Sequence, residues 1–209
     1  MMAMEFKRRI AAAEKHLAAA DARLKPLIQK YSPCSIAPHD GHYGELVGSI
    51  VSQQLSTKAA ATIWKRVLEV FNGQVPVPRQ LLQADTEKLR ACGVSYQKIG
   101  YMKDLAAHIL DGRLDMAHVA SLPNDELIEQ LVAVKGIGEW SAHMFMIFSL
   151  GRLDILPVGD LGIKKGMMKL YGLSGLPDRQ AIERIAGHNN WRPYHSVASW
   201  YVWKSLDNA

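Results

Sequence analysis

Two glycines one residue apart, Gly136 and Gly138, join two helical patterns and constrain this chain more than any other feature. An apolar helix runs into Val134-Lys135-Gly136-Ile137-Gly138, and a second helix begins at Glu139. Such a turn is too tight for most residues that carry a side chain. N–H groups at the start of a helix lack partners within it and suit a phosphate. The hairpin is therefore a candidate grip on a nucleic-acid backbone, and an ordinary helix–helix corner is the competing interpretation.

The composition excludes several classes of protein but does not identify a binding partner. The 209 residues are enough for one domain or two small lobes, and 48% hydrophobic with 22% charged residues excludes a disordered chain. A net charge of +5 is compatible with a polyanion but does not establish one. Cys34 and Cys92 are too far apart in sequence for an iron–sulfur centre or a cysteine zinc site. No signal peptide and no run of roughly 20 apolar residues is present, so we expect a cytoplasmic protein.

Helical periodicity recurs along the chain, and no stretch alternates with period two for long enough to make a strand. The sequence therefore predicts an all-α protein of about ten short helices. We expect residues 1–40 to form an N-terminal helix and a connector that pack on the core, and residues 41–209 to form the main domain, with the hairpin at about 131–150. The expected helices outside the hairpin are Met4–Leu24, Tyr43–Val51, Thr57–Phe71, Pro78–Ala84, Asp85–Cys92, Ile99–Leu110, Asp125–Val134, Ile163–Leu170, Asp178–Gly187 and Pro193–Leu206, with Ser56, Asp85, Asn124 and Asp160 as N-caps.

An acid, Asp160, ends the short loop that follows the hairpin and is itself followed by Lys164 and Lys165. Asp160 can cap the next helix, carry out chemistry, or do both. The two lysines can contact phosphates or can belong to a solvated helix face.

Three separated segments carry a family resemblance. VKGIGEWSAHMFMIFSLGRLDILPVGDLGIKKG, residues 134–166, resembles the helix-hairpin-helix and Gly/Pro-loop aspartate signature of the HhH-GPD superfamily of base-excision DNA glycosylases. Within that superfamily the likeness is to the branch of DNA-3-methyladenine glycosylase II. IVSQQLSTKAAA (residues 50–61) and WRPYHSVASWYVW (191–203) resemble two further segments of that branch. The resemblance implies a compact, two-lobed helical fold with a cleft between the lobes.

The resemblance also implies an activity. A monofunctional DNA glycosylase of this kind flips N-alkylated purines, such as 3-methyladenine or 7-methylguanine, out of duplex DNA and hydrolyses them off to leave an abasic site. Asp160 matches the catalytic aspartate, which stabilises an oxocarbenium-like sugar or orients a water. Trp140 stands where bifunctional relatives have a nucleophilic lysine, so no AP-lyase activity is expected. Gly159 replaces a second acid that some relatives carry.

Further roles are carried over from the family onto matching positions. Trp140 and Trp203 match aromatic walls of the base pocket, where stacking and cation–π contact favour a cationic purine. Met144 stands where relatives can have a tyrosine, which leaves the range of lesions open. Trp64, Trp191 and Trp200 are expected in the core.

The DNA contacts implied by the resemblance fall into two groups. The turn Gln53-Gln54-Leu55 matches the wedge that enters the minor groove, although these glutamines can also be solvated turn residues. Backbone contacts are expected at Gly136, Gly138, Lys164, Lys165, Ser95 and Lys98, and Lys98 can equally be a surface charge. No cofactor is required, and the family adds a structural sodium or potassium ion on the backbone carbonyls of Val132, Val134 and Ile137. The expected partner is double-stranded DNA with alkylated bases, bound by a monomer in the bacterial nucleoid or the eukaryotic nucleus.

Two other functions remain open. One is a non-catalytic helix-hairpin-helix module that holds DNA for a partner protein. The other is a glycosylase for another class of damaged base. Asp160 argues against the first, because a carboxylate repels phosphate and a binding module has no need of one.

Overall fold

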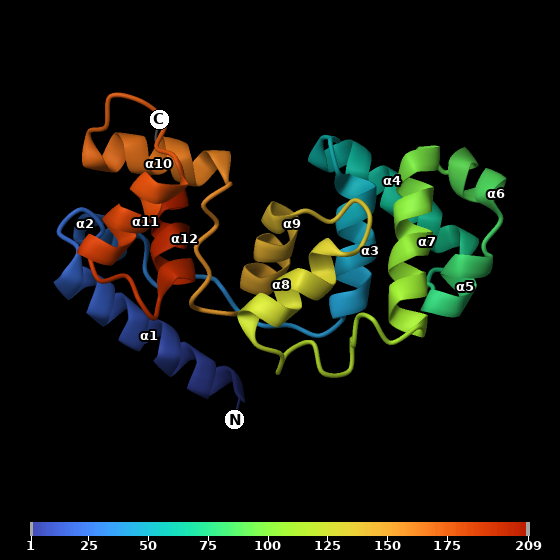
Figure 1. Cartoon of the computed structure of the whole chain (residues 1–209), viewed down its shortest axis with the longest axis horizontal. Helices are drawn as coiled ribbons and strands as arrows, with labels where there is room; N and C mark the ends of the chain where they lie inside the picture. Colours follow the sequence, from blue (N-terminus) through green and yellow to red (C-terminus); the bar gives the residue numbers. More distant parts are fainter. Residues whose placement is uncertain (1, 208–209) are drawn as a thin grey trace. The chain divides into compact units, whose positions relative to one another are not determined.

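The computed structural model describes residues 2–207, with the backbone alone for residues 2 and 3, and its regular structure is entirely helical in that range (Figure 1). Twelve α-helices and one π-helical turn occur there, slightly more than the ten or so expected. The elements are α1 (Met2–Ala20), α2 (Lys25–Tyr31), α3 (His42–Ser52), α4 (Thr57–Val70), α5 (Pro78–Gln83), α6 (Thr86–Ala91), α7 (Tyr96–Leu110), α8 (Asn124–Val132), α9 (Glu139–Met144), η1 (Phe145–Ser149), α10 (Leu161–Tyr171), α11 (Arg179–His188) and α12 (His195–Lys204).

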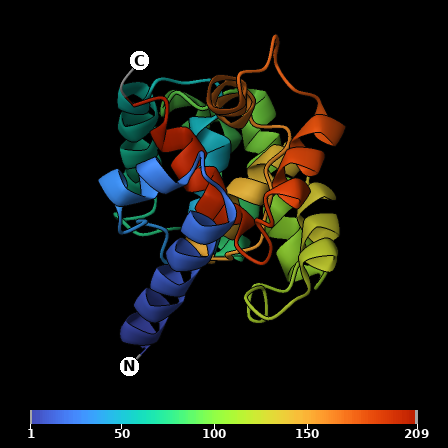
Figure 2. The same ribbon diagram turned by 90° about the vertical axis from the view of Figure 1, so that its left-hand side faces the viewer.

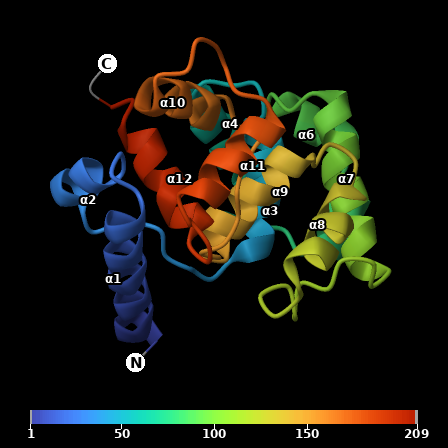
Figure 3. The ribbon, with the colours of Figure 1, turned by 60° about the vertical axis from the view of Figure 1, so that its left-hand side comes forward.

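The chain divides into two compact lobes. The terminal lobe comprises Met1–His39 and Met146–Ala209, and the central lobe comprises Asp40–Phe145. In the terminal lobe α12 packs against α1, α2 and α10, as Figures 2 and 3 show for the red helix beside the blue ones. Every residue of α12 from His195 to Val202 is buried. The N-terminal segment is thus built around the same helix as the C-terminal part of the chain.

The first helix is shorter than the periodicity predicts. It ends at Ala20 instead of Leu24, because the chain turns at Asp21, whose side chain is fully buried. The Asp21 carboxylate accepts hydrogen bonds from the Tyr171 hydroxyl and, at 2.8 Å, from the indole of Trp191. These partners lie 150 and 170 residues away in sequence, and a buried carboxylate requires them.

In the central lobe α7 packs against α3, α5 and α6, and α3 packs against α4 (Figure 1). The predicted caps Ser56 and Asp85 are confirmed, since each side chain accepts a backbone N–H of its helix. Two differences from the predicted boundaries concern the residue that caps the helix. Helix α7 begins at Tyr96 and not at Ile99, because Ser95 caps it. Asn124 lies inside α8, and Pro123 holds the cap position.

Two expectations concern the interior and the membrane. Trp191 and Trp200 are buried as predicted, whereas Trp64 is only partly buried. Within residues 2–207 no helix is both long and apolar enough to cross a bilayer.

Candidate active site

Asp160 is the N-cap of α10, as the sequence predicts. Its Oδ1 accepts the backbone N–H of Ile163 at 2.7 Å, and the backbone of Asp160 is extended, with φ −73° and ψ 128°. The same Oδ1 accepts the indole Nε1–H of Trp203 at 2.8 Å. Two donors that converge on one oxygen fix the carboxylate in direction as well as in place.

Trp203 is flanked by a second aromatic residue that sequence reasoning did not single out. The ring of Phe148 lies 5.6 Å from that of Trp203, centroid to centroid, at an interplanar angle of 33°. Phe148 is 43% exposed, although the apolar run FMIFS in which it lies predicts a buried helix. Its segment forms the π-helical turn η1, and such turns are frequent at functional sites. The structure therefore assembles an acid and two aromatic rings in the terminal lobe.

Two glycines of α10 allow α12 to approach closely. A Cβ on Gly162 would lie 2.9 Å from both Asp160 Oδ1 and Trp203 Cδ1. A Cβ on Gly166, one turn later, would lie 2.7 Å from the backbone oxygen of Val202. The absence of side chains at these two positions is what allows the indole to reach the acid.

The glycine hairpin lies between α8 and α9 in the central lobe. Gly136 has φ +84°, and any Cβ there would overlap the ring of Tyr101. The N–H of Lys135 donates to Asp104 Oδ2 at 2.8 Å. Gly138 is the N-cap of α9, with open space where a Cβ would stand. The turn thus requires glycine at Gly136 for two reasons, its positive φ and the aromatic ring beside it.

The predicted wedge is a tight turn after α3. Leu55 N–H donates to the Ser52 carbonyl at 3.1 Å, Gln54 is exposed, and Leu55 is 38% exposed. The side chain of Gln53 differs from its neighbours, because its Nε2 donates to the Gly136 carbonyl at 2.7 Å. The structure therefore brings the wedge turn and the hairpin together through Gln53.

The other predicted contact residues lie in several different environments. Trp140, on α9, is 51% exposed, and Met144, at the end of the same helix, is partly buried. On α10, Lys165 is exposed and Lys164 partly buried. Ser95 caps α7 through its hydroxyl. The Lys98 ammonium donates to the carbonyl of Val51, in the last turn of α3, at 2.8 Å and to that of Gln53, in the wedge turn, at 2.5 Å.

The hairpin carbonyls are compatible with a monovalent cation. Neutral carbonyl oxygens are the donors that replace the water shell of such ions. The Val134 carbonyl accepts the Ile137 N–H at 3.1 Å, and a carbonyl oxygen has a second lone pair that can face an ion. The intervening Gly136 carbonyl is taken by Gln53. Among residues 2–207 no cluster of His, Cys, Asp or Glu could hold a metal ion instead.

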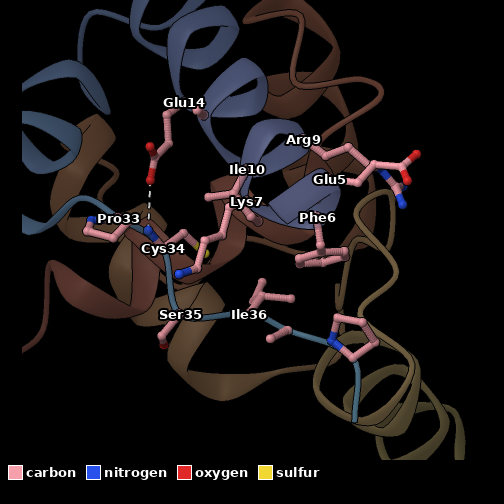
Figure 4. Close-up of a pocket in the computed structure, with 13 residues that line it drawn as sticks. Glu5, Phe6, Lys7, Arg9, Ile10, Glu14, Pro33, Cys34, Ser35 and Ile36 are labelled. Atoms are coloured by element: carbon pink, nitrogen blue, oxygen red, sulfur yellow. Dashed lines mark hydrogen bonds between the residues drawn. The ribbon is translucent and has the colours of Figure 1, made fainter. Parts of the chain in front are cut away.

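A separate cavity of about 790 Å³ opens in the terminal lobe between α1 and the connector at residues 33–38 (Figure 4). Apolar side chains such as Phe6, Ile10 and Ile36 line it, and Glu14 accepts the N–H of Cys34 at its edge. Burial raises the pKa of the Cys34 thiol to about 12, so this cysteine is no nucleophile at neutral pH. The lining does not include Asp160, Phe148 or Trp203.

Comparison with known proteins gives one family. Residues 47–191 match the family described as "HhH-GPD superfamily base excision DNA repair protein". The chain is 37% identical over 198 residues to DNA-3-methyladenine glycosylase 1 of Schizosaccharomyces pombe, an alignment that covers 92% of this chain and 86% of the relative. It is 32% identical over 197 residues to the alkylbase DNA glycosidase-like protein mag2 of the same yeast, covering 92% of each chain.

Solved structures agree with this assignment. A crystal structure of DNA-3-methyladenine glycosidase from Bacillus halodurans is similar with a TM-score of 0.84 and 39% identity, over 94% of this chain and 90% of the other. The 3-methyladenine DNA glycosylase Mag1 of Schizosaccharomyces pombe, in complex with abasic DNA, gives a TM-score of 0.76 and 36% identity, over 92% and 95% of the two chains.

Proposed function

The chain belongs to the HhH-GPD superfamily of base excision DNA repair proteins, and we propose that it is a monofunctional glycosylase that removes N-alkylated purines from duplex DNA. The observation that carries this proposal is the hydrogen bond from the indole of Trp203 to the carboxylate of Asp160. It occurs in a chain that is similar over nine-tenths of its length to a 3-methyladenine glycosylase. The similar glycosylase Mag1 was solved in complex with abasic DNA, which supports DNA as the partner.

The chemistry follows from the charge of the substrate. A 3-methyladenine or 7-methylguanine base is cationic, and it leaves as a neutral molecule when the bond to C1′ breaks. Positive charge then builds up on the sugar, where the Asp160 carboxylate stabilises it, and water adds to C1′ and loses a proton. Because the leaving group is already good, the site needs no strong general acid. Asp160 can stabilise the sugar cation, orient the water, or do both.

The strand stays intact in this mechanism. Strand cleavage by a glycosylase needs an amine that attacks C1′ and forms a Schiff base. Trp140 has no amine at the position where bifunctional relatives have lysine, and its half-exposed indole suits stacking against a flipped base. Met144 is the proposed apolar contact on the same helix as Trp140, and in the terminal lobe Phe148 adds a second aromatic ring beside Trp203.

The central lobe supplies the proposed grip on DNA. Gly136 and Gly138 present backbone N–H groups to a phosphate, and Lys164 and Lys165 of the terminal lobe add positive charge. Gln54 and Leu55 form the wedge that offsets part of the unstacking cost, while Gln53 anchors their turn. The carbonyls of Val132, Val134 and Ile137 would hold a sodium or potassium ion that draws a phosphate toward the hairpin. We expect a monomer that acts where DNA is kept, in a bacterial cytoplasm or a eukaryotic nucleus.

Release of bases from methylated DNA tests the proposal. The protein should release 3-methyladenine or 7-methylguanine, detected by chromatography, and should leave alkali-labile sites in otherwise intact strands. Asp160→Asn should abolish release yet bind a duplex with an abasic analogue as tightly as the parent protein. Binding without release in the parent protein would favour the non-catalytic module. Release of oxidised or mismatched bases in place of alkylated ones would favour a glycosylase for another class of damaged base.

A further inference from the structure

The turn that carries Gln54 and Leu55 has a backbone conformation that its sequence does not favour. Gln53 has φ −49° and ψ 132°, Gln54 has φ +58°, and the Leu55 N–H closes the turn on the Ser52 carbonyl. These angles define a type II turn, whose third residue needs a positive φ and is ordinarily glycine or asparagine. Glutamine in this position is strained, so another part of the structure must hold the turn.

The Gln53 side chain ties the turn to the Gly136 carbonyl, and the ammonium of Lys98 binds the backbone of the turn itself. Nζ donates to the carbonyl of Gln53 at 2.5 Å and to that of Val51 at 2.8 Å. The Gln53 carbonyl belongs to the central peptide of the turn, and types I and II differ mainly by a flip of that peptide. A cation bound to this oxygen therefore favours the type II form, and with it the positive φ of Gln54.

Lys98 is well placed to act as a fixed anchor. It lies in the first turn of α7, where Ser95 Oγ accepts its backbone N–H, and partial burial lowers the pKa of its ammonium. The same helix supports the hairpin, since Tyr101 fills the space beside Gly136 and Asp104 accepts the Lys135 N–H. Residues of α7 thus contact both the wedge turn and the glycine hairpin, and this one helix fixes the two turns relative to each other.

We propose that Lys98 is a positioning residue that keeps the Ser52–Leu55 turn in its type II form, so that Gln54 and Leu55 are presented to the duplex. This inference rests on the proposed function for its catalytic consequence. It also gives Lys98 a role other than the phosphate contact expected from the sequence. A lysine ammonium that already donates to two carbonyls has fewer N–H groups left for a phosphate. Positioning of the turn and contact with a phosphate therefore predict different results.

The test compares Lys98→Met and Lys98→Arg with a matched control, Lys103→Met. Lys103 lies on the same helix and also donates to a backbone carbonyl, that of Ala84 at 2.8 Å, away from the wedge. Single-turnover release of 7-methylguanine is measured from a paired duplex and from a single-nucleotide bulge, in which extrusion needs less help. Binding to a duplex with an abasic analogue is measured over a range of salt concentrations.

A positioning role predicts four results together. Lys98→Met should slow release from the duplex roughly tenfold, as expected when a strained conformer is no longer held, and should slow release from the bulge far less. Its salt dependence of binding should equal that of the parent protein. Lys98→Arg should release the base from the duplex at close to the parent rate. Lys103→Met should be less stable than the parent protein but should release the base from the duplex at the parent rate. A crystal structure of Lys98→Met should show the turn relaxed, with a negative φ at residue 54.

Other outcomes would overturn the proposal. If Lys98→Met lowers the slope of log K against log salt by about 0.9 and slows both substrates equally, Lys98 is a phosphate contact. If Lys103→Met slows the duplex reaction as much, the effect is general loss of structure. If Gln54 keeps its positive φ in Lys98→Met, the turn does not depend on the lysine. A parent protein that releases no alkylated base would refute the proposed function, and the crystal structure would still decide the role of Lys98 in the turn.

Discussion

The indole N–H of Trp203 and the backbone N–H of Ile163 converge on the same oxygen of Asp160. In the proposed mechanism Trp203 is therefore more than a wall for a flipped base, because it also directs the carboxylate that we expect to face the sugar. If both residues act as proposed, this hydrogen bond couples the recognition of a lesion to the acid that acts on it.

Trp203→Phe separates these two contributions, since phenylalanine keeps an aromatic face and removes the donor. Hydrogen bonds to charged groups contribute about 1.5–3 kcal/mol, so we expect the single-turnover rate to fall by about tenfold to a hundredfold with a smaller change in affinity for an abasic duplex. Trp200→Phe is the matched control, because it removes the indole donor to Ser35 from the same helix. It should lower stability and leave the rate unchanged. Equal rate losses in both variants would mean that the Trp203 bond only supports the fold.

The cap role of Asp160 can be separated from its chemistry in a similar way. Asp160→Ala should cost about 1 kcal/mol of unfolding free energy, as loss of an N-cap does, together with all base release. Asp178→Ala removes an equivalent cap from α11, where Asp178 Oδ1 accepts the Ala181 N–H at 2.8 Å. It should show a similar loss of stability in urea unfolding and full activity. Activity that survives in Asp160→Ala would remove the acid from the mechanism.

The sequence predicts those parts of the molecule that depend on neighbours along the chain. Caps at Ser56, Asp85 and Asp160 were found because an N-cap acts on the residues that directly follow it. The all-helical fold follows from helical periodicity along the chain, and the HhH-GPD family from three motifs in the right order.

What the sequence could not show depends on contacts across long separations. Helix α1 stops at Ala20 because Tyr171 and Trp191 hold Asp21, and no local pattern reveals that. Phe148 was missed because an apolar run gives no sign of a π-helical turn that leaves one ring exposed beside Trp203. Lys98 was read as a surface charge or a phosphate ligand, since its carbonyl partners lie more than forty residues earlier.

Gly162→Ala tests the close approach of α10 and α12 at the acid. The added methyl group would lie 2.9 Å from Asp160 Oδ1 and from Trp203 Cδ1, so one of them must move. Misplacement of a reacting group by about 1 Å can cost roughly a hundredfold in rate, and we expect a loss of that order in base release. Gly187→Ala on α11 is the control, because its Cβ would meet open space and alanine favours helix. A Gly162→Ala protein of full activity would show that the acid and the indole tolerate displacement.

Stability in acid should depend on the pair that Asp154 forms at the start of α12. Burial raises the pKa of this carboxyl, but the hydrogen bond and charge of His195, 2.6 Å away, and the charge of Arg192 outweigh burial, so the net pKa lies below its ordinary value. A carboxyl with a lowered pKa stabilises the fold at pH values above about 3.9, its pKa in the unfolded chain, and loses that contribution as the pH falls through the folded value. Asp154→Asn should therefore be less stable than the parent protein at pH 6, with a difference that shrinks as the pH falls below about 4. Urea unfolding of both proteins at a series of pH values measures this difference in unfolding free energy. A difference that stays constant as the pH falls would mean that the carboxylate charge contributes nothing to stability.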